Sequence, residues 1–207
     1  MTDQSEIKRR RPAARPGEIQ AAALELFTER GFEATRLDDV ASRAGLSKAA
    51  IYLYFKDKVS ILQALVQDLV GGRIAVAAAL IGKHQGPVEP VLRTLLDTIA
   101  ERMTTTRLPF IIKLIVSESR AHPEIGRWYL KMVIGKAIPL FRQLIQRGID
   151  QGEFRPVDAD LAVKSVIAPM LFAALWKTVF EPIGADPVDI RALARHHMDI
   201  IIRGLKP

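Results

Sequence analysis

The chain has 207 residues, 49% of them hydrophobic and 26% charged, a composition typical of an ordinary globular protein. Its formal net charge of +7 is compatible with a polyanionic partner but does not require one. Because there is no cysteine, disulfides, thiolate zinc sites and cysteine nucleophiles are excluded. The longest apolar run, 166–176, is too short to cross a bilayer, so we expect a cytoplasmic protein with no membrane partner.

The N-terminal quarter of the chain predicts an arm followed by three helices. Residues 1–16 combine arginine and proline without periodicity, which indicates a disordered basic arm. Apolar side chains then recur at spacings of three and four, as on one face of an amphipathic helix that ends at Gly31. Two short helices follow: one stops at Gly45, and Ser47 is placed to cap the next, 48–55.

The rest of the chain has longer helical patterns. We expect helices near 57–82, 88–106, 108–121, 124–151, 158–180 and 187–204. Asp158 is a candidate N-cap, Asp186 followed by Pro187 is another, and Pro139 and Pro169 fall inside helices that they should kink. The predicted fold class is therefore all-α with about nine helices: a small domain over 17–56 continues into a larger helical bundle over 57–207.

The link between the two short helices is typical of a helix-turn-helix. Gly45 supplies a left-handed turn residue and Ser47 begins the second helix. On that helix Ile51 and Phe55 share one face, while Lys48 lies on the opposite face with Tyr52 and Lys56. An exposed face of cations and tyrosine suits the DNA major groove, although the same periodicity also fits the solvated face of an ordinary bundle.

The residues themselves resemble the DNA-binding signature of the TetR family of bacterial regulators. The matching stretches are Gly31-Phe32-Glu33-Ala34-Thr35, Leu37-Asp38-Asp39-Val40-Ala41, Arg43-Ala44-Gly45-Leu46-Ser47-Lys48-Ala49-Ala50-Ile51-Tyr52-Leu53-Tyr54-Phe55, Lys58 and Leu62. The resemblance covers roughly residues 17–62. The chain departs from the family pattern at Arg36, where threonine or serine is usual, and at Ala49, where glycine is common.

The resemblance implies a DNA-contacting role for eight residues. Phosphate contacts are implied for Thr35, Tyr52, Tyr54 and Lys58, although the two tyrosines could instead be packing aromatics. Base-edge contacts are implied for Lys48, Ala49 and Ala50, and Arg36 is a further candidate contact. Because Arg36 replaces the usual capping residue, we expect Thr35 to cap the first short helix. The arm over 1–16 either adds DNA contacts or only aids solubility.

For the larger domain the resemblance implies a pocket and a dimer interface. Candidates for lining a pocket for a small, apolar effector are Met103, Phe110, Leu114, Trp128 and Trp176, although such apolar stripes also fit a plain core. The last two helices are expected to form a four-helix interface with a second copy through Ala168, Phe172, Leu175, Ile201 and Ile202. No catalytic residue, metal site or cofactor is predicted, because the four histidines lack ligand spacing.

The predicted function is a homodimeric repressor that binds double-stranded DNA at a palindromic operator and is released by an unidentified small-molecule effector. The helix that begins near residue 57 is expected to transmit effector binding to the helix-turn-helix domain. Two alternatives stay open: an activator or ligand-independent DNA-binding factor of the same fold, and an all-α enzyme or lipid-binding module with an incidental helix-turn-helix.

Overall fold

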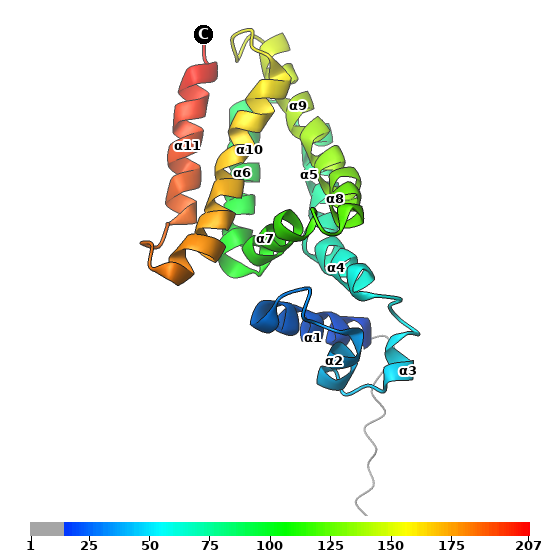
Figure 1. Cartoon of the computed structure of the whole chain (residues 1–207). Helices are drawn as coiled ribbons and strands as arrows, with labels where there is room; N and C mark the ends of the chain where they lie inside the picture. The colour runs from blue at the N-terminus through cyan, green and yellow to red at the C-terminus, as the bar shows by residue number, and fades with distance from the viewer. Residues whose placement is uncertain (1–14) are drawn as a thin grey trace, which may run out of the picture. The chain divides into compact units, whose positions relative to one another are not determined.

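The computed structural model describes residues 15–207 (Figure 1). Of the predicted arm, residues 1–14 lie outside the described residues, whereas Arg15 and Pro16 belong to the first helix, which therefore begins two residues earlier than predicted. Within the described part every regular element is a helix and there is no strand, which confirms the all-α fold class. The chain divides into two compact units, Met1–Val66 and Gln67–Pro207.

The predicted number of helices is confirmed for the described residues. When directly adjoining helical segments are counted as one, nine helices result: 15–30, 37–43, 48–51, 58–83, 88–105, 108–118, 123–150, 159–183 and 190–205. The six long ones begin and end within three residues of the predicted bounds. Hydrophobic periodicity therefore located the long helices well, because each of them buries one apolar face.

Four helices make up the first unit. They are α1 (Arg15–Arg30), α2 (Leu37–Arg43), α3 (Lys48–Ile51) and α4 (Lys58–Val66). Helix α1 contacts both α2 and α4, and α2 contacts α3. The apolar face of α1 is buried as predicted, and α4 adds Ile61 and Leu62 to the same core. Helix α4 thus packs with the helix-turn-helix, although the predicted boundary near residue 56 placed it in the larger domain.

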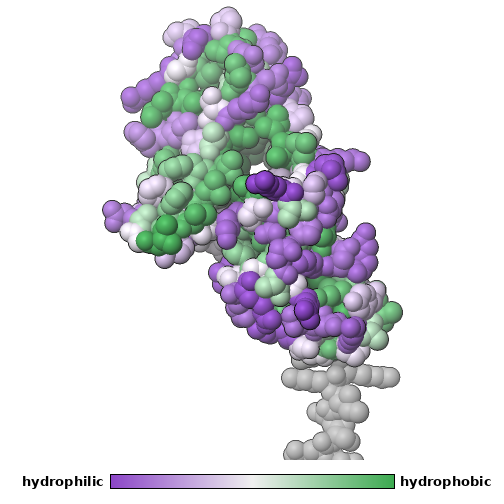
Figure 2. Space-filling view, viewed as in Figure 1, coloured by the Kyte–Doolittle hydropathy of each residue, from purple (hydrophilic) through white to green (hydrophobic). Residues whose placement is uncertain are grey.

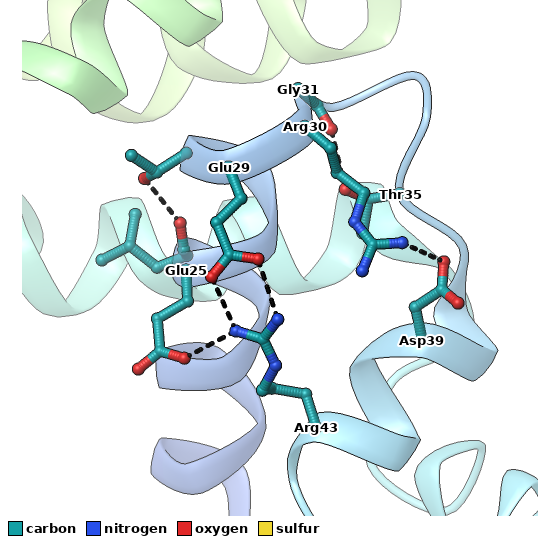
Figure 3. Close-up of polar contacts among 9 residues, drawn as sticks. Glu25, Glu29, Arg30, Gly31, Thr35, Asp39 and Arg43 are labelled. Carbon is teal, nitrogen blue, oxygen red and sulfur yellow. Dashed lines mark hydrogen bonds and ion pairs between the residues drawn. The ribbon is translucent and has the colours of Figure 1, made fainter.

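Helix α2 begins differently from the prediction. Thr35 is only 1% exposed, and its hydroxyl donates to the carbonyl oxygen of Gly31 at 2.7 Å (Figure 3). The N-cap is Arg36, whose backbone N–H donates to Oδ2 of Asp39 at 3.1 Å. The expectation that Thr35 caps α2 was wrong, because its hydroxyl bonds the end of α1 and an acid at the third helical position provides the cap.

The second unit holds seven α-helices. They are α5 (Gly72–Lys83), α6 (Val88–Thr105), α7 (Leu108–Glu118), α8 (Pro123–Tyr129), α9 (Gly135–Asp150), α10 (Ala159–Leu175) and α11 (Ile190–Leu205). Its core is made mainly by α6, α9, α10 and α11. As predicted, Pro139 lies inside α9 and Pro169 inside α10.

Wider helical turns interrupt the long helices of this unit. They are the π-helical segments η2 (Gln67–Gly71), η3 (Leu130–Ile134) and η4 (Trp176–Phe180), and the last leads into the 3₁₀ turn η5 (Glu181–Ile183). A π turn inserts a residue into the helix and shifts the apolar face that follows it. Sequence periodicity did not reveal these segments, because each inserts only one irregular turn into an otherwise continuous pattern.

Of the two N-caps predicted in the second unit, one is confirmed and the other is wrong. The carboxylate of Asp158 accepts from the backbone N–H groups of Asp160 and Leu161, so that cap is confirmed. Helix α11 begins later than predicted: Asp189 caps it by accepting from the N–H of Ala192 at 3.0 Å. The backbone carbonyl of Asp186 instead accepts from the indole of Trp176.

Two helices, Lys58–Lys83 and Ala159–Ile183, are long and apolar enough to cross a membrane by length and composition alone. The sequence did not predict these segments, because no uninterrupted apolar run in it is long enough. In the most apolar part of Ala159–Ile183, 33% of the residues are buried within the unit. The other residues of this part are at least partly exposed.

Candidate nucleic-acid interface

The turn between α2 and α3 has the geometry that the sequence predicts. Gly45 has a φ of 66°, a left-handed conformation that side chains other than glycine rarely adopt. The backbone N–H of Leu46 then donates to the carbonyl of Ala41 at 2.8 Å. The hydroxyl of Ser47 accepts from the N–H of Ala50 at 3.2 Å, which confirms Ser47 as the N-cap of α3.

Helix α3 has one buried and one exposed face. Ile51 is fully buried and Phe55 is 8% exposed, as predicted, so they anchor the helix on the core of the unit. The helix is shorter than predicted and ends at Ile51, because the N–H groups of Leu53 and Tyr54 bond carbonyls three residues back and tighten the last turn.

Most of the predicted DNA contacts lie at the surface of this unit. Arg36, Lys48 and Ala49 are exposed, as are Tyr52 and Tyr54, at 51% and 38%. Ala50 is partly buried. An exposed surface that combines cations, phenol groups and small side chains can donate to phosphates and approach base edges.

The side chain of Lys58 is bound within the unit and is less exposed than most of the other predicted DNA contacts. Its ammonium group donates to the carbonyls of Phe32 and Glu33 at 2.8 and 3.2 Å, and it stands 4.4 Å from the centre of the Phe32 ring. The side chain is 21% exposed. The sequence did not indicate this arrangement, in which Lys58 and the buried Thr35 both bond the segment that joins α1 to α2.

An arginine-centred network ties α1 to α2. Arg43 donates to both carboxylate oxygens of Glu29, at 2.9 and 2.8 Å, and to Glu25 at 3.0 Å (Figure 3). The hydrogen bonds from Arg43 hold the pKa of Glu29 below its ordinary value. Arg30, the residue that follows Glu29, pairs with Asp39 at 3.3 Å. This network was not predicted from the sequence, although the four-residue spacing of Glu25 and Glu29 places both on one helix face.

Lys48, the first residue of α3, pairs with an acid on α2. Its ammonium group donates to Oδ2 of Asp38 at 2.8 Å. This hydrogen bond raises the pKa of Lys48 above its ordinary value. The side chains are 70% and 49% exposed, which leaves both of them accessible from outside the unit.

The five residues predicted to line a pocket come from α6, α7, α8 and η4. Helix α7 contacts α6, α8 and η4, so it is the common neighbour of the set. Met103 and Leu114 are buried, whereas Phe110, Trp128 and Trp176 are partly buried. Figure 1 shows α7 crossing between the α8 and α10 sides of this unit.

The predicted interface residues divide between surface and core. Ala168 and Phe172 are exposed, while Leu175 and Ile201 are partly buried. Ile202 is 3% exposed and belongs to the core of the unit, so its assignment to an interface needs correction. The 3.6-residue periodicity of a helix does not tell which of the adjacent residues Ile201 and Ile202 points into the core.

An apolar surface continues beyond the residues that the sequence singled out. Its exposed members on α10, η4 and η5 are Leu161, Leu171, Phe172, Val179, Phe180 and Ile183; we call them the α10–η5 face. The rings of Phe172, Trp176 and Phe180 form a row with centroids 5.5 Å apart. Figure 2 shows hydrophobic residues gathered over α10 and the turn that follows it. The sequence analysis missed the η4 and η5 members.

Comparison with known proteins agrees with this geometry. Residues 19–65 match the model described as bacterial regulatory proteins, tetR family, and residues 83–196 match the tetracyclin repressor-like C-terminal domain. The HTH-type transcriptional regulator YfiR of Bacillus subtilis is 32% identical over 148 residues, which cover 69% of each chain. The HTH-type transcriptional repressor KstR2 of Rhodococcus jostii is 27% identical, with 93% of this chain and 92% of the relative covered.

Solved structures show the same fold. The regulator FadR of Bacillus subtilis, solved in complex with stearoyl-CoA, superposes with a TM-score of 0.73 at 20% identity and covers 91% of this chain and 98% of its own. Both family models that match describe transcription regulators. The chain therefore belongs to the TetR family of helix-turn-helix, DNA-binding transcription regulators.

Proposed function

We propose that this regulator is a homodimeric repressor that binds a palindromic operator and is released by a small amphipathic effector. The observation that carries the DNA-binding part is the arrangement of α3 and the turn that follows it, in which Ile51 and Phe55 are buried while Lys48 and Tyr52 are exposed. Two such helices, related by a twofold axis, match two half-sites of a palindrome. A role on DNA also supports a cytoplasmic location.

Within the interface we assign Lys48, Ala49 and Ala50 to base edges. They occupy the first turn of α3, the part of a recognition helix that lies deepest in the major groove. Lysine can donate to O6 and N7 of guanine, and alanine can contact the methyl group of thymine. Tyr52, Tyr54 and Arg36 are exposed donors that suit phosphate oxygens.

Thr35 and Lys58 are the less direct members of the proposed phosphate set. The Thr35 hydroxyl donates to Gly31, so it would have to exchange that carbonyl for a phosphate oxygen. The Lys58 ammonium group donates to two carbonyls and also pairs with the carboxylate of Glu33, whose Oε1 lies 3.6 Å away. The Glu33 side chain is 64% exposed, so a phosphate would have to take the place of that carboxylate beside the ammonium group.

The assignment of Lys58 to a phosphate predicts a loss of affinity that does not depend on the DNA sequence. Lys58→Ala should weaken binding to specific and non-specific duplexes alike and reduce the slope of log K against log salt by about 1 per subunit. Titrations at four salt concentrations measure the slope. Since Lys58 also bonds the turn at 32–33, a melting curve must show that the variant is folded. A folded variant with an unchanged slope contradicts the assignment.

The Lys48 assignment predicts a change in sequence preference. Lys48→Ala should lower the ratio of operator affinity to non-specific affinity about tenfold per half-site, because a base contact discriminates by ~1–3 kcal/mol. Selection of binding duplexes from a randomised pool, with wild type and variant in parallel, shows which base position loses its preference. Identical selected sequences contradict a base contact by Lys48.

The α10–η5 face supports the homodimer. It exposes apolar side chains along more than one helical segment, including Phe180 at 44% and Ile183 at 78%. Large contiguous apolar surface on a soluble protein marks a site of association. We propose that the same face of a second copy covers it, with α10 and α11 of each copy forming a four-helix interface.

The proposed effector site lies in the interior around α7. The residues that support it are Met103, Phe110, Leu114, Trp128 and Trp176, which belong to α7 or to its neighbours α6, α8 and η4. An apolar interior with aromatic side chains suits an alkyl chain. Stearoyl-CoA, the ligand in the FadR complex, has such a chain on an anionic head group, so we propose a ligand of this class.

Release by an effector requires linkage between the two sites. If stearoyl-CoA favours the state that does not bind DNA, DNA must weaken stearoyl-CoA binding by the same factor, typically about 5–150-fold. Calorimetric titration of stearoyl-CoA into free and operator-bound protein measures both affinities. Equal, measurable affinities would contradict an effector-released repressor and favour a ligand-independent factor, while tighter binding to the DNA complex would favour an activator.

A further inference from the structure

The pair between Lys48 and Asp38 joins the two helices of the helix-turn-helix at their N-terminal ends. Asp38 lies in the first turn of α2, and Lys48 is the first residue of α3. Their charged groups are 2.8 Å apart. An exposed ion pair of this kind contributes little to stability, so its position at the DNA-facing end of α3 calls for another explanation.

We propose that Asp38 is a specificity-determining positioning residue that holds the ammonium group of Lys48 toward the base edges and away from phosphates. The inference rests on the proposed function, in which Lys48 contacts bases. Asp38 acts through Lys48 and needs no contact of its own with DNA.

The chemistry of lysine explains why such a residue is needed. The ammonium group is a mobile point charge on a four-carbon stem and can donate in any direction. A nearby phosphate attracts it strongly, but a phosphate contact carries no sequence information. The carboxylate of Asp38 takes one of three donors and leaves two for acceptors such as O6 and N7 of guanine.

The neighbouring acid shows that this role is separate from helix capping. Asp39 accepts from the N-cap N–H of Arg36 at 3.1 Å and pairs with Arg30 at 3.3 Å. Asp38 reaches the other way, across the turn, to Lys48. A carboxylate at a DNA-binding surface also repels phosphates, so Asp38 lowers affinity for every sequence while favouring the one that Lys48 recognises.

The test compares Asp38→Ala with Glu25→Ala, each alone and combined with Lys48→Ala. Glu25 is the matched control, because its removal also deletes one exposed negative charge from the first unit, while Arg43 keeps its two bonds to Glu29. All proteins are full-length and are titrated with a fixed non-specific duplex and with the duplex selected by the wild type from a randomised pool.

For Asp38→Ala we expect tighter binding to the non-specific duplex, a salt slope steeper by about 0.9 per subunit, and a specificity ratio lowered about tenfold. Glu25→Ala should change affinity for both duplexes alike and leave the ratio unchanged. In the Lys48→Ala background, Asp38→Ala should behave like Glu25→Ala, since the lysine through which it acts is gone.

Three results separate the possible failures. If Lys48→Ala alone leaves the selected sequence unchanged, the proposed base contact fails and this inference fails with it. If Lys48→Ala changes the selection but Asp38→Ala keeps the wild-type ratio, only the inference is overturned. If Asp38→Ala lowers the ratio further in the Lys48→Ala background, Asp38 contacts a base itself and is not a positioning residue. Asp38→Asn replaces Asp38→Ala if melting curves show that the alanine variant is unfolded.

Discussion

Phe180→Asp should convert the regulator from dimer to monomer and abolish operator binding. Phe180 is 44% exposed, belongs to the α10–η5 face and ends the aromatic row that it forms with Trp176 and Phe172. In a twofold interface each substitution occurs twice, so two unpaired carboxylates would be buried, at a cost of several kcal/mol each. Because only the dimer presents two recognition helices to a palindrome, operator affinity should fall by about a thousandfold or more.

Sedimentation velocity measures the oligomeric state and a gel shift measures operator binding in the same samples. Val76→Asp is the matched control, since Val76 is 60% exposed on α5 and is not part of the α10–η5 face. It should leave both the dimer and the gel shift intact. If the Phe180→Asp protein is still a dimer at the protein concentration at which the wild type is dimeric, the interface lies on another face.

The sequence predicted the fold well where local signals decide it. The turn at Gly45 and the cap at Ser47 depend on a left-handed residue and a hydroxyl, which are visible in any single sequence. The long helices were located equally well, because each must bury an apolar stripe. The cap of α2 was predicted wrongly. Whether Thr35 or Asp39 supplies the capping hydrogen bond depends on where α1 ends and on which backbone carbonyl the threonine hydroxyl can reach.

The site was predictable in its residue types and only partly in its geometry. A lysine at position 58 is recognisable from the family signature. Its hydrogen bonds to the carbonyls of Phe32 and Glu33 join residues 26 and 25 positions apart, so local spacing does not predict them. The same limit applies to the α10–η5 face. The π turn at η4 shifts the exposed surface to Phe180 and Ile183, which a regular period of 3.6 does not anticipate.

Ile51→Ala should abolish DNA binding while leaving the dimer intact. Ile51 is fully buried, and with Phe55 it anchors α3 on the first unit. Replacing a buried isoleucine by alanine lowers the free energy of unfolding by ~2–5 kcal/mol, a large part of the stability of a small unit. The second unit has its own core, made by α6, α9, α10 and α11, so the loss should stay within the first.

Hydrogen exchange followed by mass spectrometry tests this directly in the full-length protein. Peptides from α2 and α3 should lose protection in Ile51→Ala, whereas peptides from α6 and α11 should exchange as in the wild type and sedimentation should still show a dimer. Leu53→Ala is the control: it removes a side chain of the same size that is 83% exposed, so it should leave the protection of α2 and α3 unchanged. If Ile51→Ala loses protection equally in α6 and α11, the two units unfold together, and the helix Lys58–Lys83 couples their stabilities as well as joining them in sequence.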